Sequence, residues 1–308
     1  MDRPSLQKQL LAALAIVALA SNRLIQLQME NAIQTSPNVP RLAASHYLNS
    51  APLIWSFLNG SLQKTVELID AVPARCSEML RAGEVEGALV PVIEYQRLSG
   101  IRLVPEVCVG SKGSVRSVVL VTRKDDLKDV HSVALDESSR TSATLLKIIF
   151  REFLNSEPDW ITSRPNVETM LSETDAALII GDPAMTFSRD DLRIFDMASL
   201  WRQFTGLGFV FAMWAVRESE AGKLAHIDFN AARDEGLREM DTIISHHETR
   251  IPLPHQELKA YLTENIRFQI DEDLEQGLKA YFELAWKHGL IPESKKLEFL
   301  RPSARTPA

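Results

Sequence analysis

Four polar side chains stand together directly after a short apolar run near the start of the chain. The stretch 45-SHYLNSAPL-53 contains His46, Tyr47, Asn49 and Ser50, all of which can make directed hydrogen bonds. A turn needs one or two such residues, and Asn or Ser just before a proline often caps a helix. The stretch therefore indicates either a helix cap or a surface that binds a polar molecule.

A second polar cluster, 136-DESSRTSAT-144, joins an apolar run to a helical pattern. Free N–H groups at a helix start, the helix dipole and several hydroxyls make a good site for a carboxylate or a phosphate. A helix cap needs only one hydroxyl. Because this cluster contains several, it favours anion binding over capping alone. The candidate binding residues are Ser138, Ser139, Arg140, Thr141 and Ser142.

The glycine-punctuated stretch 110-GSKGSVRSV-118 leads into a run of β-branched residues. It is not a phosphate-binding P-loop, because no GK[ST] follows. Neighbouring residues of a strand point to opposite faces, so only one of Arg116 and Ser117 can face a site.

Two glycine-containing stretches carry weaker signals. Gly181 and Asp182 end an apolar run, where Asp182 either accepts a hydrogen bond from a ligand or caps the next helix. Thr205 and Gly206 begin 205-TGLGFVFAMW-214, and glycine at this point permits close approach of a ligand or a hinge.

Composition excludes several other classes of function. The formal net charge of −7 argues against nucleic acid or an anionic membrane as the main partner. Cys76 and Cys108 form no CxxC pair and are expected to be buried free thiols. The pair His246-His247 lacks HExxH spacing and is interpreted as solvated, so no metal site is predicted.

Short apolar runs alternate with helical segments from Arg41 onward, which predicts an α/β fold. The expected strands are 42–47, 66–69, 88–92, 103–107, 115–122, 132–135, 176–180, 193–195 and 209–216. The expected helices are 73–81, 141–154, 229–247, a short one after 254, and 273–288.

The two longest strands, 115–122 and 209–216, bracket a middle α/β set, as in a protein whose chain crosses to a second lobe and returns. We therefore expect one discontinuous lobe of residues 41–122 and 213–300, and a second lobe of residues 123–212. A ligand would bind in the cleft between the lobes.

Both termini are expected to lie outside this core. Residues 1–40 are interpreted as an N-terminal extension, and 301–308 as a disordered tail. Within the extension, residues 1–20 resemble a secretion signal, whereas Met29 allows an alternative start. The apolar run of residues 10–20 is too short to span a bilayer, which takes about 20 apolar residues.

Six segments, in this order, resemble the menaquinone-biosynthetic chorismate dehydratase family of the futalosine route. They are YLNSAPLI, GALVPVIEY, GSVRSVVL, ALDESSRTS, AALIIGDPA and TGLGFVFAMWA, within residues 41–217. That family has a fold similar to type II periplasmic binding proteins. The chain departs from the family's pattern at His46 and at Ser114.

The resemblance implies a cytoplasmic carbon–oxygen lyase that converts the dianion chorismate to 3-[(1-carboxyvinyl)oxy]benzoate and water, without metal or organic cofactor. Asn49 and Ser117 are the catalytic candidates, and His46 is a fallback base. Tyr47 and Ser50 would shape the wall of the site. The reaction gains aromaticity, so the protein mainly has to orient the substrate and assist one proton transfer.

The proton acceptor is the open point. No Asp or Glu lies in 45–53 or 113–117, and a carboxylate beside a dianion would be repelled unless protonated or hydrogen-bonded. The substrate's own enolpyruvyl carboxylate is therefore the expected acceptor. The alternative function is a non-catalytic solute-binding protein for a small carboxylate, which would agree with the signal-like residues 1–20. The sequence does not predict an oligomeric state.

Overall fold

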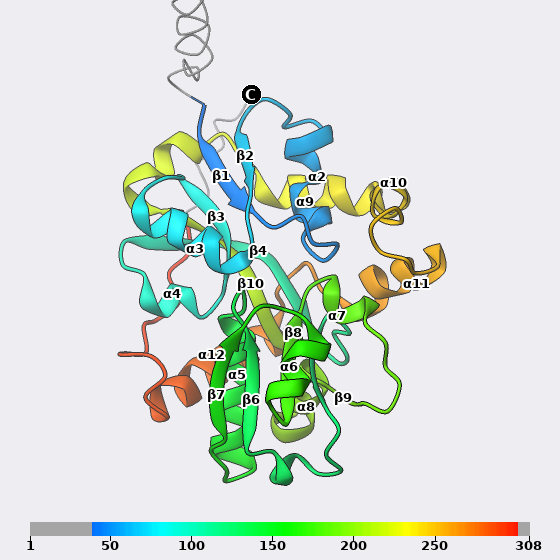
Figure 1. Cartoon of the computed structure of the whole chain (residues 1–308). Coiled ribbons are helices and arrows are strands. Elements are labelled where there is room, and N and C mark those ends of the chain that lie inside the picture. Colours follow the sequence, from blue (N-terminus) through cyan, green and yellow to red (C-terminus); the bar gives the residue numbers. More distant parts are fainter. Residues whose placement is uncertain (1–38, 301–308) are drawn as a thin grey trace, which may run out of the picture. The chain divides into compact units, whose positions relative to one another are not determined.

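A computed structural model describes residues 39–300, which form two five-stranded sheets with helices packed around them (Figure 1). The predicted α/β class is therefore confirmed. The expectations for the N-terminal extension and the tail fall on residues outside the described part. No helix within residues 39–300 is long and apolar enough to cross a membrane.

The first sheet has the strand order β2-β1-β3-β10-β4. Its strands are β1 (Arg41–Ala44), β2 (Glu67–Asp70), β3 (Gly87–Pro91), β4 (Ile101–Ser111) and β10 (Phe209–Arg217). β1 runs parallel to β2 and β3, whereas β10 runs antiparallel to β3 and β4. The long apolar strand near 209–216 thus returns the chain to the first sheet, as the sequence predicted.

The second sheet has the order β7-β6-β8-β5-β9. Its strands are β5 (Val118–Thr122), β6 (Ser132–Asp136), β7 (Asp159–Ser163), β8 (Ala176–Ile180) and β9 (Arg193–Asp196). β5 pairs antiparallel with β8 and β9, so the placement of residues 118–122 in the first lobe is wrong. A fully apolar strand fits the middle of either sheet, so its composition does not reveal its partners. The remaining lobe boundaries stay a proposal.

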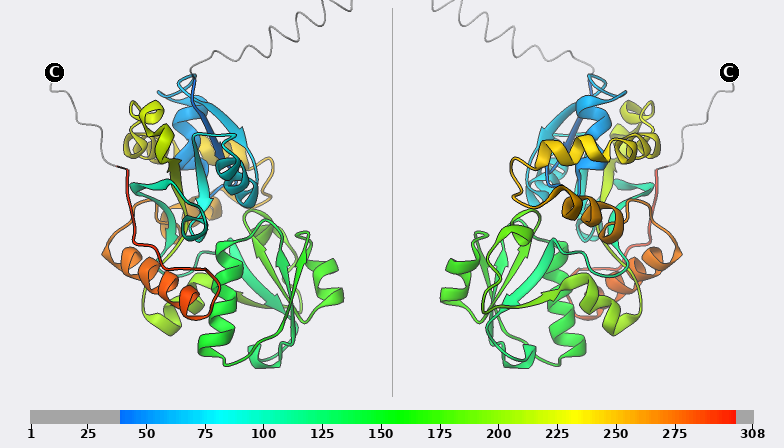
Figure 2. Two further views of the ribbon diagram at one scale, coloured as in Figure 1. Left: turned by 90° about the vertical axis from the view of Figure 1, so that its left-hand side faces the viewer. Right: turned by 90° about the vertical axis from the view of Figure 1, so that its right-hand side faces the viewer.

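Helices connect the parallel strands and cover the sheets. They are α2 (Ala51–Asn59), α3 (Pro73–Ala82), α4 (Glu94–Arg97), α5 (Thr141–Ile148), α6 (Val167–Glu173), α7 (Pro183–Thr186), α8 (Met197–Thr205), α9 (Phe229–Arg238), α10 (Met240–His247), α11 (His255–Ala260) and α12 (Glu272–Lys287). The helix expected over 229–247 breaks at Glu239, and the one over 141–154 continues beyond Ile148 as a π-helical turn. α12 packs on β10 of the first sheet and on α5 of the second (Figure 2).

The large aromatic side chains lie inside, with Trp201, Trp214 and Tyr281 almost fully buried. Cys76 and Cys108 are buried free thiols, as predicted. The polar stretches singled out in the sequence follow the carboxyl ends of β1 and β6, which is where parallel strands present loops to a ligand.

Candidate active site

A cavity lies where the loop after β1 faces the loop after β6. Its empty space is about 530 Å³, including the part open to solvent, which is within the common range for ligand sites of about 300–1,000 Å³. The polar lining residues are Ser45, Tyr47, Asn49, Ser50, Ser138, Ser139, Arg140, Thr141 and Ser142. The others are Pro73, Leu89, Pro91, Val109, Val118, Ile180, Gly181, Phe211 and Ala212. One cavity therefore joins two polar loops that lie 90 residues apart in the chain.

Ser50 stands at the N-cap position of α2 but does not cap it with its side chain. Its Oγ donates instead to Asn49 Oδ1 at 3.1 Å and lies 3.2 Å from Ser45 Oγ. The helix begins all the same, because Pro52 in the first turn fixes a helical φ. The Ser50 hydroxyl thus hydrogen-bonds the Asn49 side-chain carbonyl oxygen, and the Asn49 side-chain NH₂ group remains as a donor.

Tyr261 connects Asn49 to Ser117 from a π-helical turn that follows α11. Its hydroxyl donates to Ser117 Oγ at 2.7 Å and also contacts the Asn49 side chain. Burial raises the pKa of Tyr261, and the contacts with Ser117 and Asn49 oppose that rise. The phenol therefore stays neutral and holds Asn49 by hydrogen bonding. The sequence analysis missed this residue, because a lone Tyr in the short, mostly polar segment 255-HQELKAYLTEN-265 matches no motif.

Tyr47 lines the cavity, and its pKa is clearly shifted. Burial raises its pKa to about 12, Asp136 adds to the rise, and a contact with the Ser138 side chain opposes it. Its phenol is therefore a proton donor, not a base, at neutral pH. Gly181 lies directly under the ring: a Cβ added there would stand 2.6 Å from Tyr47 Cε2, and its φ is +70°. Gly181 thus allows the ring to pack against the second sheet.

The hydroxyls of the loop after β6 are not used to cap α5. Arg140 occupies the N-cap position without a side-chain cap bond. Ser138 Oγ donates to Asp136 Oδ1 at 2.6 Å, and Thr141 Oγ1 accepts from the Ile93 N–H at 3.3 Å. Ser139 is 5% exposed, and its Oγ has no hydrogen-bond partner within residues 39–300. A buried free hydroxyl beside first-turn N–H groups is suited to an anionic ligand.

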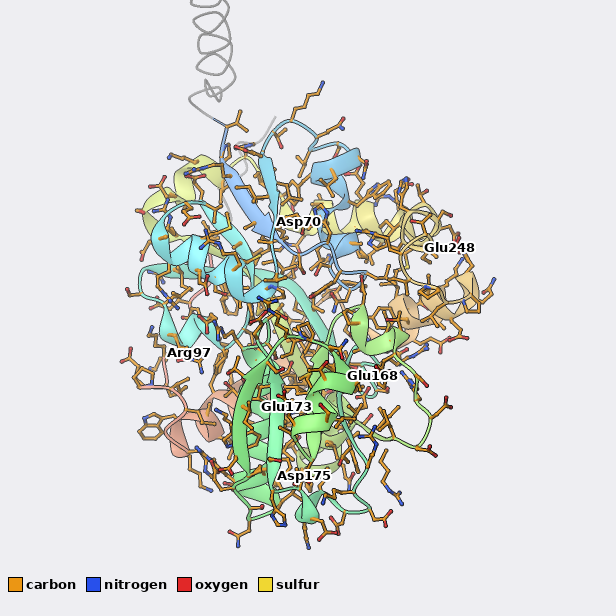
Figure 3. The ribbon with its side chains drawn as sticks, viewed as in Figure 1. Asp70, Arg97, Glu168, Glu173, Asp175 and Glu248 are labelled. Atoms are coloured by element: carbon orange, nitrogen blue, oxygen red, sulfur yellow. The ribbon has the colours of Figure 1, made fainter. Side chains whose placement is uncertain are left out.

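The described lining of the cavity contains no Asp, Glu, His, Lys or Cys. Its ionisable side chains are those of Tyr47 and Arg140, and Arg140 lies 3.6 Å from Glu78 of α3. The acidic residues Glu168, Glu173 and Asp175 lie beside the second sheet, away from the loop after β1 (Figure 3). The site can therefore bind and orient an anion but offers no ordinary base.

A family model described as menaquinone biosynthesis matches residues 40–287. The chain belongs to this menaquinone biosynthesis family. A protein named chorismate dehydratase from Thermus thermophilus is 31% identical over 261 residues, covering 79% of this chain and 93% of the relative. The family resemblance inferred from the six segments is thereby confirmed.

The fold of this family member is similar to those of periplasmic binding proteins. The aliphatic sulphonate binding protein SsuA from Escherichia coli has a TM-score of 0.57 at 16% identity, covering 87% of this chain and 93% of its own. A Candida albicans gene product with the generic periplasmic binding protein fold has a TM-score of 0.62 at 12% identity, with coverages of 85% and 97%. At these identities the likeness concerns the fold alone, and it confirms the predicted fold class.

Ser117, a catalytic candidate from the sequence, does not line the cavity in this structure. Its side chain is fully buried and accepts the hydrogen bond from Tyr261. Arg116, in a left-handed conformation with φ of 61°, reaches Glu257 instead of the cavity. The Ser117 hydroxyl therefore faces Tyr261, which in turn contacts the Asn49 side chain.

Asp182, Thr205 and Gly206 also lie outside the lining, contrary to expectation. Asp182 neither caps α7 nor faces the cavity, because its Oδ1 accepts the Leu48 N–H at 3.0 Å and so joins the two sheets' loops. Thr205 and Gly206 end α8: the threonine hydroxyl donates to Trp201 O, and Gly206 is the left-handed C-cap residue. The TGLG pattern is a helix end, for which glycine is the favoured residue.

His46 lines a different cavity, so the structure does not support it as a fallback base. Its ring is directed toward Asp70, with Nδ1 3.6 Å from Asp70 Oδ2. The sequence analysis also missed Ser45 and the apolar wall. The wall residues sit on buried strands, where a pattern cannot separate a core contact from a ligand contact.

Proposed function

We propose that this chain is a chorismate dehydratase, a hydro-lyase that converts chorismate to 3-[(1-carboxyvinyl)oxy]benzoate and water. The name of the Thermus thermophilus relative and the membership of a menaquinone biosynthesis family support the substrate and the route. The single observation that carries the chemistry is the lining, within residues 39–300, of hydroxyls, one amide and one guanidinium without a base.

The two ends of the cavity suit the two ends of a cyclic dianion. Ser139 and the first turn of α5 would hold one carboxylate, and Arg140 adds positive charge. Leu89, Val109 and Phe211 offer apolar surface to the ring. Binding in this way fixes the substrate between loops of both sheets and so supplies orientation, the main requirement of an elimination that gains aromaticity.

The substrate itself would carry the proton. The enolpyruvyl carboxylate removes the C3 proton, the C4 hydroxyl departs, and that proton and hydroxyl leave together as water. The Asn49 amide, held by Ser50 and Tyr261, would donate to the departing C4 oxygen. An amide is too weak a base to take the proton, and the Tyr47 phenol is already protonated at neutral pH because its pKa is about 12.

The direct test is to incubate the purified chain with chorismate. We expect chorismate to disappear as a product lighter by one water appears, with the ultraviolet absorbance of a substituted benzene. Mass spectrometry and absorbance follow both changes. Chorismate that binds and stays intact would overturn the proposal and favour the solute-binding alternative, whose sequence support lies in residues 1–20 outside the described part. A biosynthetic role would place the chain in the cytoplasm.

Ser139→Ala is expected to weaken chorismate binding by about 1–2 kcal/mol, the usual value of one hydrogen bond to a charged group. The residue is buried, lines the cavity and has an unused hydroxyl, so folding should be unaffected. Ser172→Ala on exposed α6 is the matched control. Calorimetric titration measures both, and equal affinities would remove Ser139 from the site.

Tyr261→Phe is expected to lower kcat about tenfold, because the Asn49 amide loses the hydroxyl that orients it. KM should change little, since the Tyr261 ring does not line the cavity. Steady-state kinetics separate the two parameters. A variant that loses thermal stability but keeps kcat would make Tyr261 a packing residue only.

The kcat for chorismate should be nearly independent of pH between about 6 and 9. Carboxylates ionise below this window, and Tyr47, with a pKa of about 12, ionises above it. A protein base titrating near neutrality would instead give a profile that rises with pH. His46→Ala should keep most of the activity and a kcat that is nearly independent of pH. A large loss of activity or a changed pH dependence in this variant would indicate that His46 is the base.

A further inference from the structure

A second cavity lies next to the loop that carries Asn49, and no step of the proposed reaction uses it. Along this loop the side chains of Tyr47 and Asn49 line the first cavity, whereas His46, which precedes them in the chain, lines the second. The second cavity has about 580 Å³ of empty space, including the part open to solvent. Its walls come from α2 and from the end of α10.

Two buried imidazole nitrogens in this cavity have no hydrogen-bond partner within residues 39–300: His46 Nε2 and His247 Nε2. His247 is only 8% exposed, so its interpretation as a solvated residue is wrong; its Nδ1 lies 2.9 Å from Ile243 O, so Nδ1 carries a proton and donates. A buried polar atom without a partner costs about 1–3 kcal/mol. Both belong to residues that line this cavity, so a small rotation of either ring toward a ligand would give its nitrogen a partner.

The charges facing the cavity are basic. Arg250 lines the cavity; burial raises the pKa of the Asp182 carboxyl, and the positive charge of Arg250 opposes that rise. His246 completes the basic side, with its ring 5.5 Å from that of Trp55. Within residues 39–300 no group of side chains is arranged to hold a metal ion. In a chain of net charge −7, this cluster suits an anion.

The cavity lining also includes apolar side chains. Trp55 and Ile54 of α2 are among them, and Trp55 is only partly buried. A flat apolar body can lie on the indole while a carboxylate reaches Arg250 and the imidazole of His247.

We propose that this cavity is a second binding site, for a small carboxylate with an aromatic or similarly flat body. Its occupation would reach the first cavity in two ways. His46 shares a loop with Asn49. The charge of Arg250 opposes the rise that burial causes in the pKa of Asp182, and Asp182 Oδ1 accepts the Leu48 N–H. A carboxylate ligand would compete with Asp182 for the charge of Arg250 and so alter the contact between the two sheets' loops.

Benzoate is the probe, titrated into the whole chain with labelled histidine side chains followed by nuclear magnetic resonance. The imidazole signals of His46 and His247 should shift saturably. Arg250→Gln should weaken this binding about tenfold, and Trp55→Leu should weaken it as well. Arg238→Gln, at the exposed end of α9, and Ser139→Ala, in the first cavity, should leave it unchanged.

Unmoved His46 and His247 signals at saturating benzoate would overturn the proposal. So would equal affinity in Arg250→Gln and Arg238→Gln, or a loss of these shifts in Ser139→Ala, which would assign the binding to the first cavity. Because the readout is binding of benzoate, the outcome does not depend on whether chorismate is turned over.

Discussion

Asn49→Ala should reduce kcat for chorismate by about 10²–10³-fold, the usual loss when one donor to a developing oxyanion is removed. The Asn49 carbonyl oxygen is held by Ser50, and Tyr261 contacts the same side chain, so the amide is oriented before substrate binds. KM should change much less, because this donor acts mainly in the transition state. Steady-state kinetics with chorismate measure both.

Asn166→Ala is the matched control, because Asn166 is a true helix cap. Its Oδ1 accepts the Thr169 N–H at 2.9 Å at the start of α6. This variant should lose about 1 kcal/mol of stability and keep its kcat. If Asn49→Ala behaves like Asn166→Ala, losing stability but not turnover, then Asn49 has no part in the reaction.

Gly236→Ala should destabilise the fold by about 2–3 kcal/mol. Gly236 lies on α9 where it crosses α2, and an added Cβ would stand 1.9 Å from Pro52 O. Alanine gains up to about 1 kcal/mol of helix propensity over glycine, but the clash is with backbone and cannot be relieved by a rotamer change. The shift of α2 should also reduce activity, because Pro52 lies two residues after Ser50.

Gly222→Ala provides the comparison, since a Cβ there meets nothing within 4 Å. It should change the free energy of unfolding by less than about 0.5 kcal/mol. Urea denaturation of both variants measures the difference. Equal midpoints for the two would show that the close approach of α9 and α2 is not required.

The sequence predicted most of the architecture because local signals marked it. Alternating runs located nine of the ten strands, and surplus hydroxyls identified the loops at 45–50 and 136–144 that meet in one cavity. These extra hydroxyls were informative because α2 and α5 both begin without using them as side-chain caps. β7 was missed because Asp159–Ser163 is polar and mostly exposed at a sheet edge.

The errors concern contacts between residues far apart in the chain. Ser117 was predicted to be a catalytic residue, but its partner Tyr261 comes 144 residues later, from a segment without a recognisable motif. Asp182 was assigned to a ligand or a cap, whereas it bonds the Leu48 N–H 134 residues earlier. No local pattern specifies such partners, because either side chain could equally face solvent, a ligand or a neighbouring loop.

The proposed reaction depends on the enolpyruvyl carboxylate of chorismate acting as the base in a cavity whose described lining offers none. The most direct measurement compares chorismate with an analogue whose enolpyruvyl carboxylate is replaced by a carboxamide. The analogue should still bind, as a competitive inhibitor, while its dehydration is slower by about 10²–10⁴-fold, the usual contribution of a general base. Dehydration of the analogue at the rate of chorismate would contradict this role of the carboxylate and require a base from the protein.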